Sequence, residues 1–385
     1  MSTQTLGPAA ATSAPPAGER RRPSLLRRAV FLIPAGLALL AGLDAALMLI
    51  GLPAPVRTSR LPEVHGVLMV IGFVGTLISL ERAVALRRRT GFAAPALLGL
   101  GALLEVSPAP LRVGQAVMLA GTVATTAVYA ALWRRQRDDA VLVQTLGSVL
   151  SAGAVLLWLG GVPVPLLLPW LVGFVVLTIG GERLELARLA MGPGAGGILV
   201  LLSGGLLAGV VAALLWPPIG APLFGATLLA LGGWLAAHDV AWRTIRASSA
   251  PQFMAGCMLA GYFWLVVAGL TWLLGGPVLT GPRYDVVIHA MFLGFTISMI
   301  MAHAPSILPA VLRRALPYHP VLIVPAALMH AGLVLRLWIG DGYGVGAAWQ
   351  AGGLINIIAL LLFVVVAAGL IARAAAAARA RGRNR

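Results

Sequence analysis

The chain has 385 residues, of which 59% are hydrophobic and only 10% are charged, and its formal net charge is +16. A soluble globular protein carries about 25% charged residues, so this composition excludes a water-soluble domain of this size and predicts a chain that lies in a lipid bilayer. All 28 cationic residues are Arg, and they separate apolar runs instead of lining one face, which argues against nucleic acid as a partner. The one cysteine, Cys257, excludes disulfides and Cys-based metal centres within the chain.

Apolar runs long enough to cross the hydrocarbon core, about 20 residues each, occur twelve times. They predict an all-α, polytopic membrane bundle of about twelve spans over residues 29–376, embedded in the lipid bilayer. Residues 1–28 and 377–385 are predicted to be basic tails, the first disordered because it is rich in Ser, Ala and Pro. The expected spans, in chain order, are Val30–Leu52, Leu61–Leu86, Phe92–Val106, Leu111–Trp133, Ala140–Gly160, Pro163–Leu186, Gly194–Trp216, Ile219–Ala241, Pro251–Gly275, Tyr284–Leu308, Pro320–Ile339 and Val345–Ala372.

The arginines are distributed unevenly between the two sides of this arrangement. Loops and tails on one side contain 23 of them, and the other side contains 5. By the positive-inside rule the arginine-rich side faces the cytoplasm, so both termini are expected to be cytoplasmic and the host to be a bacterial-type inner membrane. A cleaved signal peptide is disfavoured, because the first apolar run is long enough to span and no clear cleavage site follows it.

A motif recurs in the second, sixth and tenth spans. In each span a Gly-Phe pair is followed nine residues later by an ionisable residue. The three occurrences are Gly72-Phe73 with Glu81-Arg82, Gly173-Phe174 with Glu182-Arg183, and Gly294-Phe295 with His303. This spacing predicts a repeating unit of four helices, and therefore three four-helix arcs related by pseudo-threefold symmetry. The alternative is that Gly-Phe pairs are frequent in membrane helices because small residues allow close packing.

Two histidines lie at matching depth in the second and tenth spans. Both spans begin on the arginine-poor side, and at 1.5 Å per residue His65 lies ~6 Å into its span and His289 ~9 Å beyond Arg283. Two His on facing helices can hold a haem iron from both sides. The alternative for each is a helix-end residue bonded to a loop carbonyl. Met69, one helical turn after His65, is either a soft ligand for haem or copper or a packing residue.

The runs His65-Gly-Val-Leu-Met69 and Asp285-Val-Val-Ile-His289-Ala-Met291 resemble helices 2 and 10 of subunit I of the haem-copper oxidases and nitric oxide reductases, a family with twelve spans in three four-helix arcs. The segment from His289 to Met299, ahead of His303, resembles the late His-bearing helix of the NnrS family, whose haem- and copper-containing membrane proteins are linked to nitric oxide response. These resemblances imply haem b, held by His65 with His289 or Met291, and copper as a second candidate. They imply a role in electron transfer, in metal or haem handling or in nitric oxide response, with a redox partner or a small gas ligand.

The chain also departs from the oxidase pattern. Helix 10 of that family carries His-x-His, whereas this chain has His289-x-Met291. The family's binuclear centre needs histidines on helices 6 and 7, and the corresponding spans here contain none. Catalytic reduction of oxygen or nitric oxide is therefore not expected, and the sequence favours a protein that is not an enzyme.

Other ionisable residues on the arginine-poor side leave alternatives open. Arg336 and Arg283 are at the level of the two histidines, as partners for haem propionates or as interface anchors. His330 is either a further haem or copper ligand or an interhelical hydrogen-bonding residue. Asp44 and Glu105 are neutral, paired with Arg or part of a proton path.

On the arginine-rich side, Glu81, Glu182 and His303 have the donor chemistry of an iron, manganese or zinc site, with helix-end ion pairs to the adjacent Arg as the alternative. His238-Asp239 is a proton-donor pair or a capped helix end. The competing function is a secondary transporter without a cofactor, since twelve spans, internal repeats and buried acids are also transporter features.

Overall fold

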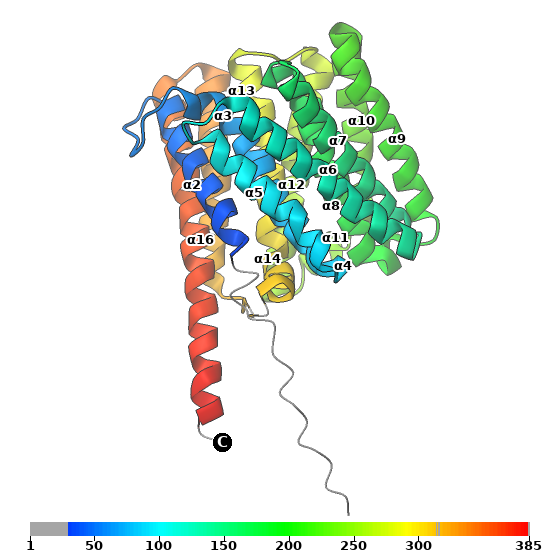
Figure 1. Cartoon of the computed structure of the whole chain (residues 1–385), viewed down its shortest axis with the longest axis vertical. Coiled ribbons are helices and arrows are strands. Elements are labelled where there is room, and N and C mark those ends of the chain that lie inside the picture. Colours follow the sequence, from blue (N-terminus) through cyan, green and yellow to red (C-terminus); the bar gives the residue numbers. More distant parts are fainter. Residues whose placement is uncertain (1–29, 313, 315, 384–385) are drawn as a thin grey trace, which may run out of the picture.

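The computed structural model describes residues 30–312, 314 and 316–383. Within these residues the chain forms helices and short connections with no strand, and eleven helices are long and apolar enough to cross a membrane (Figure 1). The expected all-α, polytopic helical bundle is therefore confirmed. The predicted tail at 1–28 and the end of the predicted tail at 377–385 lie outside the described residues.

The helices follow the expected order, and several consecutive elements join into one span. The spans are span 1, α2 (Leu32–Leu49); span 2, α3 (Arg60–Val67), η1 (Leu68–Gly75) and α4 (Thr76–Leu86); span 3, η2 (Arg89–Phe92) and α5 (Ala93–Glu105); span 4, α6 (Leu111–Gln136); span 5, α7 (Asp139–Leu159); span 6, α8 (Val164–Met191); span 7, α9 (Ala195–Leu215); span 8, α10 (Pro217–His238), with α11 (Ala241–Thr244) after it; span 9, α12 (Ala250–Gly275); span 10, α13 (Gly281–His289), η3 (Ala290–Ile297) and α14 (Ser298–Leu312); span 11, η4 (Pro320–Leu322), α15 (Ile323–Leu333) and η5 (Val334–Gly342); and span 12, α16 (Gly346–Arg383).

The third span is shorter than the others. Helix α5 has 13 residues, about 20 Å at 1.5 Å per residue, and it is not among the eleven long apolar helices. The C-terminal end of α5 nevertheless lies beside the start of span 2. The Arg60 guanidinium donates to the carbonyl oxygens of Ser107 and Ala109, which follow α5, the second at 2.6 Å. Helix α5 therefore runs from the arginine-rich side, where α4 ends, to the arginine-poor side.

Helix α16 is longer than its predicted span. It has 38 residues and continues past Ala372 to Arg383, so most of the segment predicted as a tail is helical. Its end projects beyond the other helices on the arginine-rich side (Figure 1).

Spans 2, 6 and 10, which carry the repeated motif, are the most buried of the eleven long helices. In the most apolar part of span 6, 78% of the residues are buried, and the share is 67% in spans 2 and 10 against at most 56% in the others. Helix α4 packs against α14, and α8 against η3, whereas α16 contacts α2 and so brings the first and last spans together. The central position of the three spans agrees with their predicted equivalence. The symmetry of three arcs stays a prediction.

Two of the three central spans change helix type at the motif. Gly72-Phe73 lies in the π-helical segment η1 and Gly294-Phe295 in the π-helical segment η3, each eight residues long. Segment η1 begins three residues after His65, and η3 begins directly after His289. Because π-helical segments are rare and are frequent at functional sites, they draw attention to the two histidines.

Candidate functional site

His65 is held by the first span. Its Nδ1 atom lies 2.9 Å from the carbonyl oxygen of Gly42 in α2. A carbonyl can only accept a hydrogen bond, so Nδ1 carries the proton and Nε2 keeps its lone pair. Nε2 has no hydrogen-bond partner among the described residues. It is also not one of the unpaired polar atoms that are completely shielded from solvent. It is therefore available as a ligand atom.

Met69 lies against the same glycine. A Cβ atom at Gly42 would overlap the Met69 sulfur, so the thioether fills the contact between η1 and α2. This position corresponds to the packing alternative for Met69. Met291 is fully buried in η3. It is two residues from His289, a spacing that places two side chains on different faces of a helix.

His289 is oriented by a carboxylate one turn earlier. Its Nδ1 atom lies 3.0 Å from the Asp285 carbonyl oxygen and 3.2 Å from Asp285 Oδ1, which leaves Nε2 without a partner in the described chain. Asp285 is fixed in turn, because Nε and Nη2 of Arg336 donate to its two carboxylate oxygens at 2.7 Å each and Trp349 Nε1 donates at 3.1 Å. These contacts join spans 10, 11 and 12 around one imidazole.

Arg336 is thus primarily the counterion of Asp285. Its guanidinium also lies 4.7 Å above the Trp349 ring, and its remaining group, Nη1, is next to Gly353. Arg283 is exposed and lines a pocket of about 380 Å³ together with Asp341, between α12, α13 and η5. Of the two expected propionate partners, only Arg336 belongs to the network around His289.

The two histidines lie where the central spans separate. Spans 2 and 10 pack together through α4 and α14 on the arginine-rich side, whereas α3 and α13 make no comparable contact among the described residues. The surrounding helices enclose this region, since α2 contacts η1 and α16, and η5 contacts α13 and α16. The helix that holds His65, α2, thus contacts α16, which holds the Asp285 partner Trp349.

One face of each central helix keeps accessible surface in this region. His65, Met69 and Phe73, at four-residue spacing, are half-buried in span 2, as are His289 and Phe292 in span 10. Most other residues of the two spans are buried. The two imidazoles are therefore only half-buried, although His65 contacts α2.

His330 and His303 use both ring nitrogens. Trp264 Nε1 donates to His330 Nδ1 at 3.0 Å, and His330 Nε2 lies 3.5 Å from Ser298 Oγ, so His330 forms the interhelical hydrogen bonds that were one of its predicted alternatives. His303 Nδ1 lies 2.7 Å from the Met299 carbonyl oxygen, and Arg183 Nη1 lies 2.9 Å from His303 Nε2. In this arrangement neither His330 nor His303 has a nitrogen available for a metal.

The expected metal site on the arginine-rich side finds no support. In the part of the chain that the structure describes, no three His, Cys, Asp or Glu side chains are arranged to hold a metal ion. Glu81 and Glu182 come from helices that are joined by the ion pair between Arg82 and Glu185. Glu81 is paired with Arg82 at 2.7 Å, and Glu182 makes no ion pair or hydrogen bond among the described residues.

Arg183 and Asp239 form a buried ion pair. Arg183 Nε and Nη2 lie 2.9 and 3.0 Å from the two Asp239 oxygens, and the Tyr262 hydroxyl donates to Oδ2 at 2.7 Å. The Ala241 N–H donates to Oδ1 at 2.9 Å, so Asp239 caps the short helix α11. Of the two predicted alternatives for His238-Asp239, the structure shows the capped helix end, and His238 itself is exposed.

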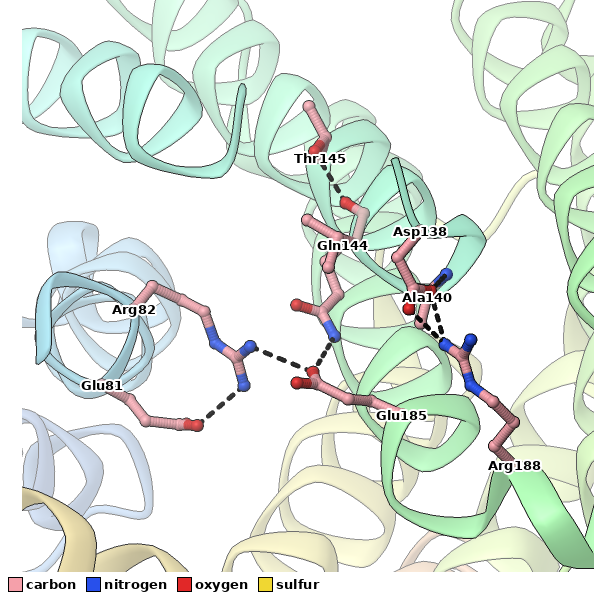
Figure 2. A network of polar contacts seen from close by, with 9 residues as sticks. Glu81, Arg82, Asp138, Ala140, Gln144, Thr145, Glu185 and Arg188 are labelled. Atoms are coloured by element: carbon pink, nitrogen blue, oxygen red, sulfur yellow. Dashed lines mark hydrogen bonds and ion pairs between the residues drawn. The ribbon is translucent and has the colours of Figure 1, made fainter. Parts of the chain in front are cut away.

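Arg82 links spans 2 and 6, as Figure 2 shows. Its Nη2 lies 2.7 Å from Glu81 Oε1, and its Nη1 lies 3.2 Å from Glu185 Oε2. Gln144 Nε2 of span 5 donates to the same Glu185 oxygen at 3.3 Å. Glu185 and Gln144 are absent from the predicted site, although Glu185 lies three residues after Glu182 and so on the same helix face.

Two further buried carboxylates have different surroundings. Asp44 Oδ2 accepts the backbone N–H of Val56 at 3.0 Å, which is a loop contact and not the pairing with Arg that was considered. Glu105 is fully buried at the end of α5, and neither of its oxygens has a partner among the described residues.

A family model described as a domain of unknown function (DUF8744) matches residues 28–372. This match covers most of the chain, so the chain belongs to that family. No curated protein and no solved structure matches the chain. The resemblance to the haem-copper oxidases or to the NnrS family stays a prediction.

Proposed function

We propose that this member of the DUF8744 family is a membrane haem protein in which His65 and His289 hold one haem b between spans 2 and 10. The observation that carries the proposal is that both imidazoles have the same hydrogen-bonding pattern. Each donates its Nδ1–H to an oxygen and leaves Nε2 free. Histidines that bind metals almost always donate the other ring N–H to a carbonyl or a carboxylate.

The four other histidines do not combine these properties. His303 and His330 use both nitrogens in contacts with other side chains or the backbone. His238 and His319 are exposed. His65 and His289, which the sequence predicts to lie at the same depth in the membrane, are thus also the two histidines whose hydrogen bonds suit haem ligands.

The surrounding groups suit a haem in this position. Asp285, held by Arg336 and Trp349, fixes the ring of His289 and increases the electron density on Nε2. The Gly42 carbonyl does the same for His65. Nη1 of Arg336, the one guanidinium group not bonded to Asp285, is a donor for an anionic propionate. Copper is not part of the proposal, because Met69 packs against α2 and His330 forms interhelical bonds.

The proposed activity is electron transfer across the arginine-poor half of the membrane. Haem iron with a histidine on each side supplies one-electron chemistry. The chain's own contribution is to hold the two rings from different helices and to surround them with apolar side chains. A redox partner would approach from the arginine-poor side, which the positive-inside rule places outside the cytoplasm. Nitric oxide response is the related proposal, in which a bound haem would supply the site for the gas and His65 and His289 would hold that haem.

The test is the absorption spectrum and the metal content of the full-length protein, extracted in mild detergent from haem-replete cells. The expected result is a Soret band with about one iron per chain, which the replacements His65→Ala and His289→Ala each abolish or shift. His238→Ala replaces an exposed histidine and serves as the matched control with an unchanged spectrum.

A wild-type protein without a Soret band, or unchanged spectra in both histidine variants, would refute the proposal. Solute uptake into vesicles by a haem-free protein with both histidines replaced would favour the secondary transporter instead.

A further inference from the structure

Three carboxylates lie near one guanidinium on the arginine-rich side of the bundle, and two of them contact it. We define the carboxylate cluster as Glu81, Arg82, Glu182 and Glu185. Arg82 contacts Glu81 and Glu185. Glu182 lies three residues before Glu185, on the same face of α8, and makes no ion pair or hydrogen bond among the described residues. When all four groups are ionised, the cluster carries two negative charges in excess.

The other charged groups around the cluster do not neutralise this excess. They are already paired with each other: Arg183 with Asp239, and Arg188 with Asp138. His303 faces the cluster from α14, but its nitrogens contact Arg183 and the Met299 carbonyl. Tyr262 of α12 donates to Asp239. Arg82 is buried and Glu81 and Glu182 are half-buried, so solvent screens the repulsion among the carboxylates only in part, and the cluster favours the binding of a positive charge.

Two uncharged side chains at the cluster have unpaired atoms. Tyr129 and Gln144 are both 0% exposed, and the Tyr129 hydroxyl and Gln144 Oε1 have no partner in the described chain. The other amide atom of Gln144 donates to Glu185 (Figure 2), and the Arg82 guanidinium lies 6.0 Å from the centre of the Tyr129 ring. Buried polar atoms normally have a partner, so these two indicate a ligand or a donor.

The ligand that fits is a proton and not a metal ion. No three His, Cys, Asp or Glu side chains within the described residues are arranged to hold a metal. The guanidinium of Arg82 lies within the cluster and repels a divalent cation. A proton needs no coordination shell, because it binds one carboxylate oxygen and turns that oxygen into a hydrogen-bond donor. Gln144 Oε1 and the neighbouring carboxylates are acceptors for such a donor.

We propose that the carboxylate cluster binds one exchangeable proton from the arginine-rich side, and that Glu182 holds it. Glu185, whose side chain is 42% exposed, connects the cluster to the surface. The proton comes from water there and returns to it, so no other reactant is needed. Because Glu81 belongs to span 2 and Glu182 to span 6, the bound proton relieves a repulsion between two central spans and strengthens their contact. Its loss leaves carboxylates that repel one another.

The first experiment is infrared difference spectroscopy between acidic and alkaline buffer on the full-length protein in lipid nanodiscs. The expected result is a protonated-carboxyl band that Glu182→Gln removes. The control Glu63→Gln changes an exposed carboxylate on the arginine-poor side and should keep the band. Should the Gln variant yield too little folded protein, Glu182→Asp keeps an ionisable group and is expected to shift the band. A band unchanged in both Glu182 variants would overturn the proposal.

The second experiment is thermal unfolding as a function of pH. The folded wild type binds the proton more tightly than the unfolded chain does, so its stability should fall as the pH rises and the proton leaves. In Glu182→Gln, which is permanently neutral, this fall should be smaller. A control series replaces choline by sodium at constant ionic strength. Sodium-dependent stabilisation that is lost in Glu182→Gln would show a metal cation in place of the proton. Neither experiment requires haem, so its outcome is independent of the proposed function.

Discussion

The ion pair between Arg183 and Asp239 offers a direct test of how the bundle is held together. The replacement Arg183→Met removes the guanidinium but keeps a long apolar side chain. It leaves Asp239 with the Tyr262 hydroxyl and the Ala241 N–H as its remaining partners. The pair joins span 6 to the segment after span 8, and through Tyr262 to span 9, so its loss should weaken the contact between these spans.

The magnitude follows from burial. The Arg183 and Asp239 side chains are 5% and 0% exposed. Removing one partner of a buried pair leaves an uncompensated charge and typically costs about 3–5 kcal/mol. The same helix provides the matched control, since Arg188 and Asp138 form an ion pair with side chains that are 52% and 21% exposed. Solvent screens such a pair, and Arg188→Met is expected to cost about 1 kcal/mol or less.

The assay is reversible unfolding in mixed micelles with increasing denaturing detergent, applied to Arg183→Met, Asp239→Asn and the double variant. Neutralising Asp239 removes the unpaired charge, so the double variant should be more stable than the sum of the two single effects predicts, by about 1–3 kcal/mol. Additive effects, or an Arg183→Met cost no larger than that of Arg188→Met, would refute the assignment of this pair as the buried link.

Two further predictions concern packing and the histidine network. Gly294→Ala should destabilise the protein by about 1–3 kcal/mol, because the new methyl group would overlap the Trp264 ring. Gly204→Ala, in a helix where nothing lies within 4 Å of the added Cβ atom, should stabilise it by about 0.5–1 kcal/mol in the same unfolding assay; equal effects would contradict the packing described. Asp285→Asn should weaken haem retention about 10–100-fold in a haem-transfer assay, because the carboxylate no longer orients His289. Unchanged retention would remove Asp285 from the site.

The composition and the hydropathy pattern were enough to determine the class of fold and nearly all of the spans. A helix that crosses the bilayer must satisfy its backbone hydrogen bonds internally and present apolar side chains, and both requirements are local in sequence. The short span expected at Phe92–Val106 is also a helix, α5, although it is not among the eleven long apolar helices. Helix α5 packs closely onto α6, since a Cβ atom added at Gly101 would lie only 2.9 Å from the Met118 backbone nitrogen. Such packing depends on a second helix, and the hydropathy of one stretch of sequence does not reveal it.

The repeated motif in spans 2, 6 and 10 was also readable from the sequence, and the structure shows that these three spans are the most buried of the eleven long helices. Depth along a helix follows from residue number, so the sequence also placed His65 and His289 at one level and Glu81 and Glu182 at another. It could not distinguish a histidine with a free nitrogen from one that is fully bonded. His303 occupies the repeat position and yet contacts Arg183 and Met299 with its two nitrogens.

Only the tertiary structure decided the partners. Arg336 is 51 residues from Asp285, and Arg82 is 103 residues from Glu185. Which side chains meet across two helices depends on the rotation of each helix about its axis and on the crossing angle. Both are set by the packing of many residues together and not by any single run of sequence. The sequence by itself therefore determined the all-α membrane class, the order of the helices and the uneven distribution of arginines. The packing decided that Arg336 holds Asp285 and that Glu182 has no ion pair among the described residues.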